Sequence, residues 1–189
     1  MADRAEIGRV YAAARSRNPA DAAIAVLALG PGATWIAAGR GASPDPALPL
    51  DLGTVSTARK HFHQEPPTAL ELESAIHAIE EEVMRARSLA PRGVPLFTAS
   101  GAIRDIARAC GAGSSPEATL SIEDVEALFH RLADTAQGAP ASRAGMPVDA
   151  EFAATLTILR EILHHLGFPS VTILRGESRD GDAWAPGSS

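Results

Sequence analysis

A short glycine-containing loop between two apolar runs constrains this chain more than any other feature. The first run covers residues 24–29, the second starts at Trp35, and the sequence GPGAT lies between them at residues 30–34. This pattern predicts a strand, a tight loop and a second strand. Glycines in such a loop let the backbone approach a ligand and direct N–H groups at anionic oxygens, as in phosphate-binding loops. An ordinary hairpin turn has the same pattern, so both interpretations stay open.

The rest of the chain alternates between helix and strand patterns. Thr68 and Glu71 form a capping box that opens a long helix, and Asp149 opens a strongly apolar helix that Gly167 ends. Further helices are expected at residues 5–14 and 103–110 and after Ser121, further strands at residues 48–55, 94–98 and 170–174, and a mobile tail at residues 176–189. The order predicts a single α/β domain. Its five-stranded mixed sheet has three antiparallel strands, two added in parallel, and helices on its faces.

A second small-residue turn follows the strand at residues 94–98. Ala99, Ser100, Gly101 and Ala102 lead directly into a helix, so the first N–H groups of that helix are free to bind an anion. Phosphate is the simplest ligand of that kind. The alternative is that Ser100 is only the N-cap of the helix.

Composition excludes several classes of protein. The net charge is −6 and the sequence pI is about 5.5, which argues against a sequence-independent nucleic-acid binder. The N-terminus lacks the apolar region of a signal peptide, and no apolar run is long enough for a membrane span. We therefore expect a cytoplasmic protein that binds neither nucleic acid nor membrane. Cys110 is the single cysteine; it is read as a packing residue, with a nucleophile as the alternative.

Histidines supply the remaining candidates for chemistry. If residues 61–63 are extended, His61 and His63 share one side of the segment, and Asp51 or Glu65 would complete a metal site. His164 and His165 end a helix, where a cation suits the helix dipole. We favour solvated or capping histidines for all four, so the sequence assigns no metal, no cofactor and no catalytic residue.

Several segments together resemble the second domain of the exopolyphosphatase and guanosine pentaphosphate phosphohydrolase (Ppx/GppA) family. They are EIGRV at residues 6–10, VLALGPGATW at 26–35, LPLDLGTV at 48–55, PP at 66–67, TASGAIR at 98–104, RAGMP at 143–147, and the closing strand with residues 176–181. The resemblance implies the actin-like, RNase H-like (ASKHA) ATPase fold. We assign residues 1–175 to this domain, and we expect residues 176–189, which are polar and contain glycine, to form a mobile C-terminal tail.

The departures from the family pattern concern its chemistry. Ala28 stands where the family has the loop aspartate, and Trp35 and Ile7 stand where it has glutamates. Pro31 replaces the middle glycine, which removes one N–H donor from the loop, and Ala33 replaces the serine. The ligand-binding positions that the resemblance and the two turns leave are Gly30, Gly32, Thr34, Ser100, Gly101 and Ala102.

Two hypotheses for function follow. The first is a degenerate Ppx/GppA phosphatase-like domain, a pseudoenzyme that acts as a non-catalytic binding or assembly module. Trp35 would anchor a homodimer or a complex with another protein, unless it turns into the core. The second is an enzyme: a phosphohydrolase of polyphosphate or guanosine pentaphosphate type completed by a partner subunit, since the family's cleft lies between two such domains, or a repurposed activity in the remodelled cleft.

Overall fold

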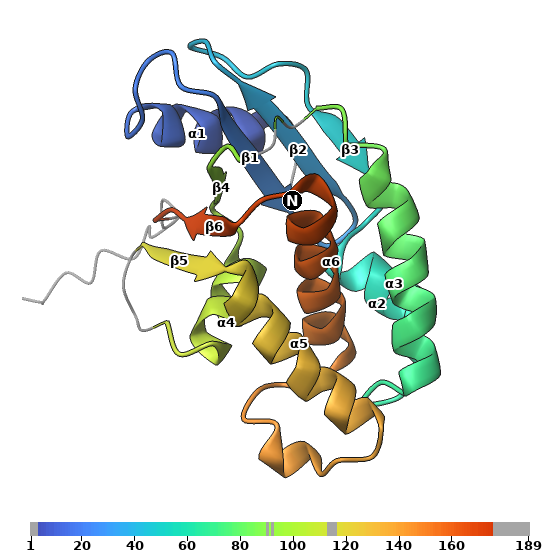
Figure 1. Cartoon of the computed structure of the whole chain (residues 1–189). Coiled ribbons are helices and arrows are strands. Elements are labelled where there is room, and N and C mark those ends of the chain that lie inside the picture. Colours follow the sequence, from blue (N-terminus) through green and yellow to red (C-terminus); the bar gives the residue numbers. More distant parts are fainter. Residues whose placement is uncertain (1–3, 90, 92, 113–116, 176–189) are drawn as a thin grey trace, which may run out of the picture.

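A six-stranded mixed sheet forms the centre of the molecule, in the order β3-β2-β1-β4-β6-β5 (Figure 1). The computed structural model describes residues 4–89, 91, 93–112 and 117–175. The strands are β1 (Ile24–Leu29), β2 (Thr34–Gly39), β3 (Leu48–Leu50), β4 (Leu96–Thr98), β5 (Ala118–Ser121) and β6 (Ser170–Ile173). β1, β2 and β3 are antiparallel, β4 and β6 are added in parallel, and β5 pairs antiparallel with β6 at the edge.

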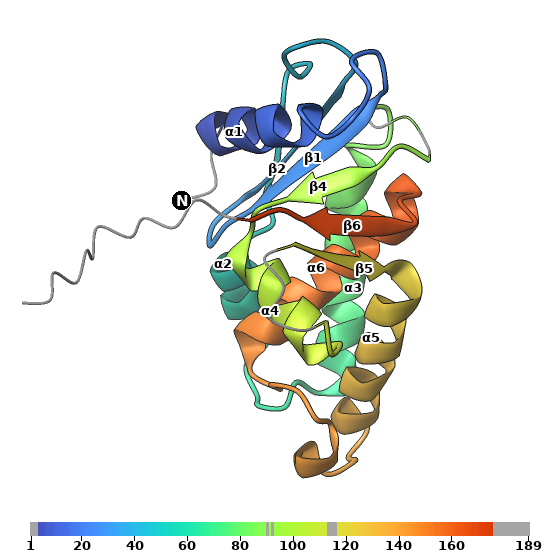
Figure 2. The same ribbon diagram turned by 90° about the vertical axis from the view of Figure 1, so that its left-hand side faces the viewer.

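Helices cover both faces of this sheet. They are α1 (Arg4–Arg15), α2 (Thr54–His61), α3 (Ala69–Met84), α4 (Gly101–Ala109), α5 (Ile122–Ala136) and α6 (Ala150–Leu166), with a 3-10 turn η1 at Ala141–Arg143. Among the described helices, α1 lies on one face of the sheet and the others lie on the opposite face (Figure 2). This arrangement separates the core into two apolar clusters.

The smaller cluster lies between the sheet and α1, and we name it the α1 cluster. Alternate side chains of β1 point to it, whereas the intervening ones point to the larger cluster, as strand geometry requires. Its buried members are Ile7, Val10, Tyr11, Ala14, Ile24, Val26, Ala28, Ala37, Phe97 and Leu174, and Trp35 packs half-buried against them. α1 thus covers β1, β2 and β4 on this face of the sheet.

α6 lies in the middle of the larger cluster and contacts α2, α3, α4 and α5. Its apolar side chains are almost completely buried, among them Leu156, Leu159, Ile162 and Leu163. Burying one such side chain contributes about 1.5–3 kcal/mol relative to leaving it exposed. The apolar sequence of this helix predicts that position.

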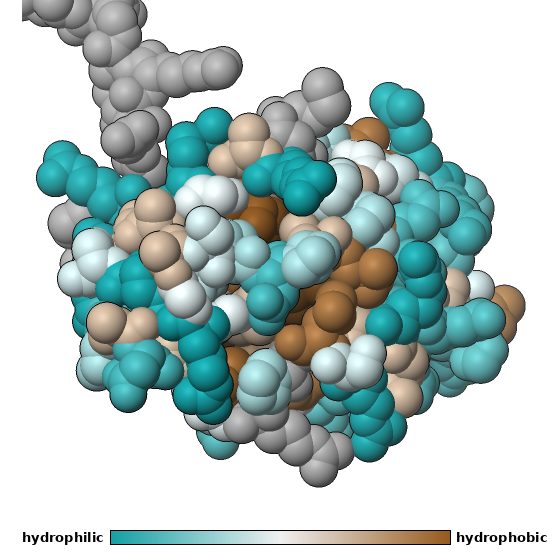
Figure 3. Space-filling model, turned by 90° about the horizontal axis from the view of Figure 1, so that it is seen from above, coloured by the Kyte–Doolittle hydropathy of each residue, from teal (hydrophilic) through white to brown (hydrophobic). Residues whose placement is uncertain are grey.

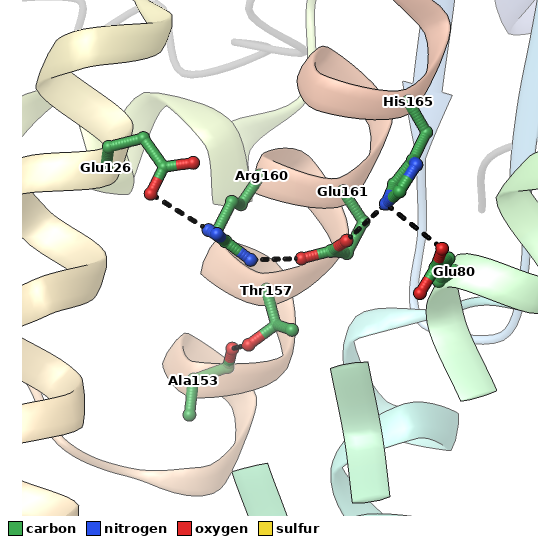
Figure 4. Close-up of polar contacts among 7 residues, drawn as sticks. All are labelled: Glu80, Glu126, Ala153, Thr157, Arg160, Glu161 and His165. Carbon is green, nitrogen blue, oxygen red and sulfur yellow. Dashed lines mark hydrogen bonds and ion pairs between the residues drawn. The ribbon is translucent and has the colours of Figure 1, made fainter. Parts of the chain in front are cut away.

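A row of charged side chains crosses α6 and joins it to two neighbours (Figure 4). Glu161 is 1% exposed, and its carboxylate lies 2.5 Å from Nη1 of Arg160 and 2.9 Å from Nε2 of His165. Arg160 also pairs with Glu126 of α5 at 3.0 Å, and His165 lies 3.7 Å from Glu80 of α3. A buried carboxylate needs such partners, so this row of charged side chains links α3 and α5 to α6.

The predicted helix ends are confirmed. Thr68 and Glu71 form both bonds of a capping box, and Asp149 accepts a bond from the N–H of Phe152 at 2.9 Å. Ser121 caps α5, with Asp124 returning the second bond. Gly167 ends α6 with a φ of 75°, which glycine adopts without steric cost.

The α/β class, the mixed sheet and its three antiparallel and two parallel strands are confirmed, but the number of strands is wrong. The sixth strand, β5, has only four residues and runs directly into the Ser121 cap of α5, so its signal is lost in the helix start. The predicted strand at residues 48–55 ends at Leu50, because Thr54 already begins α2. The expected mobile tail at residues 176–189 lies outside the described residues.

The surface seen from above the view of Figure 1 has apolar side chains in its middle, surrounded by polar ones (Figure 3). The described residues expose one large apolar side chain, Leu70, at 76%. The apolar area on this face is therefore not a row of exposed large side chains. No described helix is both long and apolar enough to cross a membrane.

Candidate functional site

The glycine loop is anchored to the N-terminus of α2. The N–H of Thr54 donates to the carbonyl of Gly30 at 3.0 Å, and the N–H groups of Val55 and Ser56 both donate to the carbonyl of Pro31 at 3.0 Å. The first N–H groups of a helix lack partners within the helix, so the loop carbonyls take the place of a side-chain cap. As a result, these N–H groups of α2 are not available to a ligand.

Two residues of the loop, Gly32 and Thr34, differ in their exposure to a ligand. Gly32 is exposed, and a side chain at its position would meet nothing within 4 Å. Thr34 is 0% exposed, and its hydroxyl donates to the carbonyl of Leu52 at 2.6 Å. A direct contact between the Thr34 hydroxyl and a ligand at the surface is therefore not supported, and Thr34 holds the segment before α2 instead.

Ser100 joins the second turn to the first. Its hydroxyl donates to the carbonyl of Leu29 at 3.1 Å, and the side chain is 4% exposed. Ser100 occupies the N-cap position of α4, but its side chain makes no capping bond. The N–H groups of Gly101 and Ala102 have no hydrogen-bond partner within the described part of the chain. Anion binding by these two groups stays a prediction.

Ala28 and Trp35 are directly opposite each other in the antiparallel register of β1 and β2. Both side chains belong to the α1 cluster, and so does Ile7 from α1. Ala28 is 0% exposed and Ile7 is 1% exposed, whereas Trp35 is half-buried. Three positions from separate elements therefore meet on one face of the sheet, and all three are apolar.

The structure does not assemble the histidine site. His61 is the last residue of α2, so the extended conformation expected for residues 61–63 is wrong. Burial lowers the pKa of His61, and the nearby charges of Lys60 and His63 lower it further. Glu65 accepts a long bond from the N–H of Ala150 instead. Within the described residues, no three or more His, Cys, Asp or Glu side chains are grouped to hold a metal ion.

The other titratable candidates are also in structural positions. Cys110 ends α4 and is half-buried, with its sulfur 3.6 Å from the carbonyl oxygen of Asp124. Burial raises the pKa of its thiol, and the carboxylate of Asp124 raises it further, which does not suit a nucleophile. His165 belongs to the row across α6, and its ring stacks on that of His164.

Comparison with known proteins assigns the chain to a family. The sequence profile of the Ppx/GppA phosphatase family matches residues 3–182. The chain belongs to this family. Among curated proteins, none shows significant similarity to the chain.

Solved structures of Ppx/GppA proteins share the fold. The type II variant of the Aquifex aeolicus Ppx/GppA phosphatase superposes with a TM-score of 0.71 at 16% identity, over 90% of this chain and 59% of that protein. A second Aquifex aeolicus structure, of its PPX-GPPA enzyme, gives 0.69 at 19% identity, over 89% and 58%. An exopolyphosphatase from Cytophaga hutchinsonii gives 0.60 at 14% identity, over 82% and 53%. The chain thus has the actin-like fold and spans less than two thirds of the length of these relatives.

Sequence reasoning missed how α2 completes this site. The sequence TVSTARKH of α2 buries only Thr54, Thr57 and Ala58 within the helix, so it lacks an apolar stripe of helical period. A usable signal was Gly53. Its Cβ position would lie 2.3 Å from the carbonyl oxygen of Pro31, so only glycine lets the two segments approach this closely.

Proposed function

We propose that this chain is a non-catalytic member of the Ppx/GppA family that acts as a binding or assembly module. The observation that carries the proposal is the meeting of Ile7, Ala28 and Trp35 in the α1 cluster. By resemblance, the family has carboxylates at these positions. In the family the aspartate organises the metal and phosphate site and the glutamates act on the metal or the attacking water, so this domain has lost all three of these carboxylates.

The chemistry of phosphoanhydride hydrolysis supports this reading. The reaction needs a divalent cation to neutralise developing charge and a group to position the attacking water. Ala28 and Ile7 are closed off from solvent, and their neighbours in the cluster are apolar. Ile7, Ala28 and Trp35 therefore offer a hydrated cation no carboxylate oxygen.

The proposal is tested directly by cation binding. Mn²⁺, a paramagnetic substitute for Mg²⁺, broadens the NMR signals of residues near a bound ion. We expect no selective broadening at Gly32 or Trp35 at millimolar Mn²⁺. The triple variant Ile7→Glu, Ala28→Asp, Trp35→Glu serves as a comparison for the same residues, provided that it folds. Selective, saturable broadening in the wild type would contradict the proposal.

The module would act through the face that carries the glycine loop. Pro31 and Gly32 are exposed there, and Ala33 and Trp35 are half-buried, so these four residues give the face uncharged and largely apolar contacts. Half-buried tryptophan is a frequent anchor of protein interfaces. We expect the occupant to be a protein, either a second copy of this chain or another chain.

The competing function is a phosphohydrolase completed by a partner subunit. It is favoured by one fact: the chain covers only 53–59% of the length of the three solved relatives above. The two proposals differ in what happens when the partner is added. For a phosphohydrolase, the partner would produce metal-dependent phosphate release. For the non-catalytic module, the partner binds and no phosphate is released.

A further inference from the structure

A cleft of about 550 Å³ opens between the start of α2, one side of α4 and the start of α6. It lies on the helix-covered face that α6 occupies, whereas the α1 cluster lies on the opposite face of the sheet. An inference about this cleft therefore goes beyond the proposed function and does not depend on the loss of catalysis.

Thr54 supplies an unused polar group to the cleft. The residue lines the cleft and is only 8% exposed, yet its hydroxyl has no hydrogen-bond partner among the residues that the structure describes. The hydroxyls of the neighbouring Ser56 and Thr34 do have partners, the carbonyls of Gly32 and Leu52. Among the described side chains, the Thr54 hydroxyl is not one of the fully buried polar atoms without a partner, so it is reached from the cleft and can bond to a ligand or water there.

The charged residues that line the cleft have an excess of carboxylates. Among the residues that the structure describes, they are Asp105, Asp149 and Glu151 against the guanidinium of Arg108. Asp105 pairs with Arg108, and Asp149 accepts the capping bond from Phe152. The carboxylate of Glu151 has no partner within the described residues. It is therefore the group that remains available to a cation.

The floor of the cleft is apolar. Met146 and Phe152 line it, and Phe152 is 7% exposed at this position. Methionine and phenylalanine accept a hydrocarbon or aromatic group in many relative positions. The cleft thus combines an apolar floor, a free hydroxyl and a free carboxylate in a volume typical of small-molecule sites.

We propose that this cleft binds a small organic amine. The ammonium group pairs with the carboxylate of Glu151 and donates to the hydroxyl of Thr54, and the hydrocarbon part lies on Met146 and Phe152. The N-termini of α4 and α6 favour an anion here, but the three carboxylates of the lining oppose it. The residual negative charge selects the amine.

Three probes of similar size and different charge test this proposal: phenethylamine, 2-phenylethanol and phenylacetate, each titrated into the full chain and followed by amide NMR. We expect shifts at Thr54, Ala102 and Met146, with phenethylamine binding about fivefold or more tightly than 2-phenylethanol. Phenylacetate should bind most weakly. Equal affinity for the amine and the alcohol, tighter binding of phenylacetate, or no shift at millimolar phenethylamine would overturn the proposal.

Variants separate a specific contact from general electrostatics. Glu151→Gln should remove the preference for the amine over the alcohol, whereas Glu123→Gln should not. Glu123 is a matched control because both glutamates are exposed and occupy the second position of a helix. Thr54→Val should weaken binding of the amine while the NMR spectrum shows an intact fold. If Glu123→Gln reduces the preference as much as Glu151→Gln, the proposed contact is contradicted.

Discussion

Gly53 and Pro31 are in such close contact that a Cβ atom on Gly53 would lie 2.3 Å from the carbonyl oxygen of Pro31. The contact brings the N-terminal N–H groups of α2 against the carbonyls of the glycine loop. It therefore joins the loop, α2 and, through α2, the central helix α6. Contacts within the protein therefore hold the loop against the start of α2.

Gly53→Ala should accordingly lower the stability of the protein by about 1–3 kcal/mol, because backbone atoms must move apart. Gly8→Ala is the matched control, since a Cβ atom there meets nothing within 4 Å and the residue lies in α1. The free energy of unfolding of this control should be unchanged or should rise by about 0.5–1 kcal/mol. Urea denaturation of both variants measures the difference. Equal stability of Gly53→Ala and the wild type would mean that the loop and α2 are loosely packed.

Glu161→Gln should destabilise the protein by about 1–3 kcal/mol, because a nearly buried carboxylate and its charged hydrogen bonds are lost. Glu126→Gln removes a more exposed member of the same row and should cost less than about 1 kcal/mol. Its side chain is 27% exposed, against 2% for Glu161. Denaturant midpoints of both variants at neutral pH measure the two losses of stability. A larger loss for Glu126→Gln than for Glu161→Gln would show that the row does not hold α6.

The carboxylate of Glu71 should make stability depend on acid pH. The N–H of Thr68 donates to it and holds the pKa of Glu71 below its ordinary value of 4.5, and the N–H of His63 adds to the effect. A lowered pKa in the folded state contributes stability above the unfolded value, and that contribution is lost as the pH falls through the folded value.

Thermal unfolding of the wild type and Glu71→Gln measures this effect. The gap between the two melting temperatures should be largest near pH 6 and should shrink toward about pH 3. Glu73→Gln, an exposed residue of the same helix, is the control that should show no such narrowing. A gap that stays constant with pH would exclude Glu71 as the titrating group.

The interface expected at Trp35 is tested by assembly. We expect the wild type to form a homodimer or to bind another protein, and Trp35→Ala to weaken that association by about 2 kcal/mol or more if the residue is central. Leu70→Ala is the control, because Leu70 is exposed on α3, away from the glycine loop. Sedimentation velocity over a range of concentrations separates the species. A monomeric wild type together with a destabilised Trp35→Ala variant would leave Trp35 as a packing residue of the α1 cluster.

Local sequence signals predicted the elements whose ends are fixed by neighbouring residues. Thr68 with Glu71, Ser121 and Asp149 each cap a helix from within a few positions, so their patterns are visible in the sequence. α2 was missed because its first N–H groups bind carbonyls of Gly30 and Pro31, more than twenty residues earlier. No local pattern contains that contact.

In the candidate site, too, contacts between neighbouring segments could be predicted from the sequence, whereas contacts between distant segments could not. The hairpin pattern implies that Ala28 and Trp35 are near each other, and their pairing follows once the loop length is known. The burial of Trp35 does not follow, because it depends on where α1 lies across the sheet. The bond from Ser100 to Leu29 spans 71 positions, so it too appears only in the fold.

We propose that the α1 cluster stands where catalytic members of the family hold a metal site. The most direct measurement is phosphate release from polyphosphate and guanosine pentaphosphate with Mg²⁺, with the Aquifex aeolicus Ppx/GppA phosphatase assayed in parallel. We predict that the wild type releases phosphate no faster than the reaction without protein does. Metal-dependent release that is abolished by Gly32→Val, a change that the space around Gly32 accommodates, would contradict it.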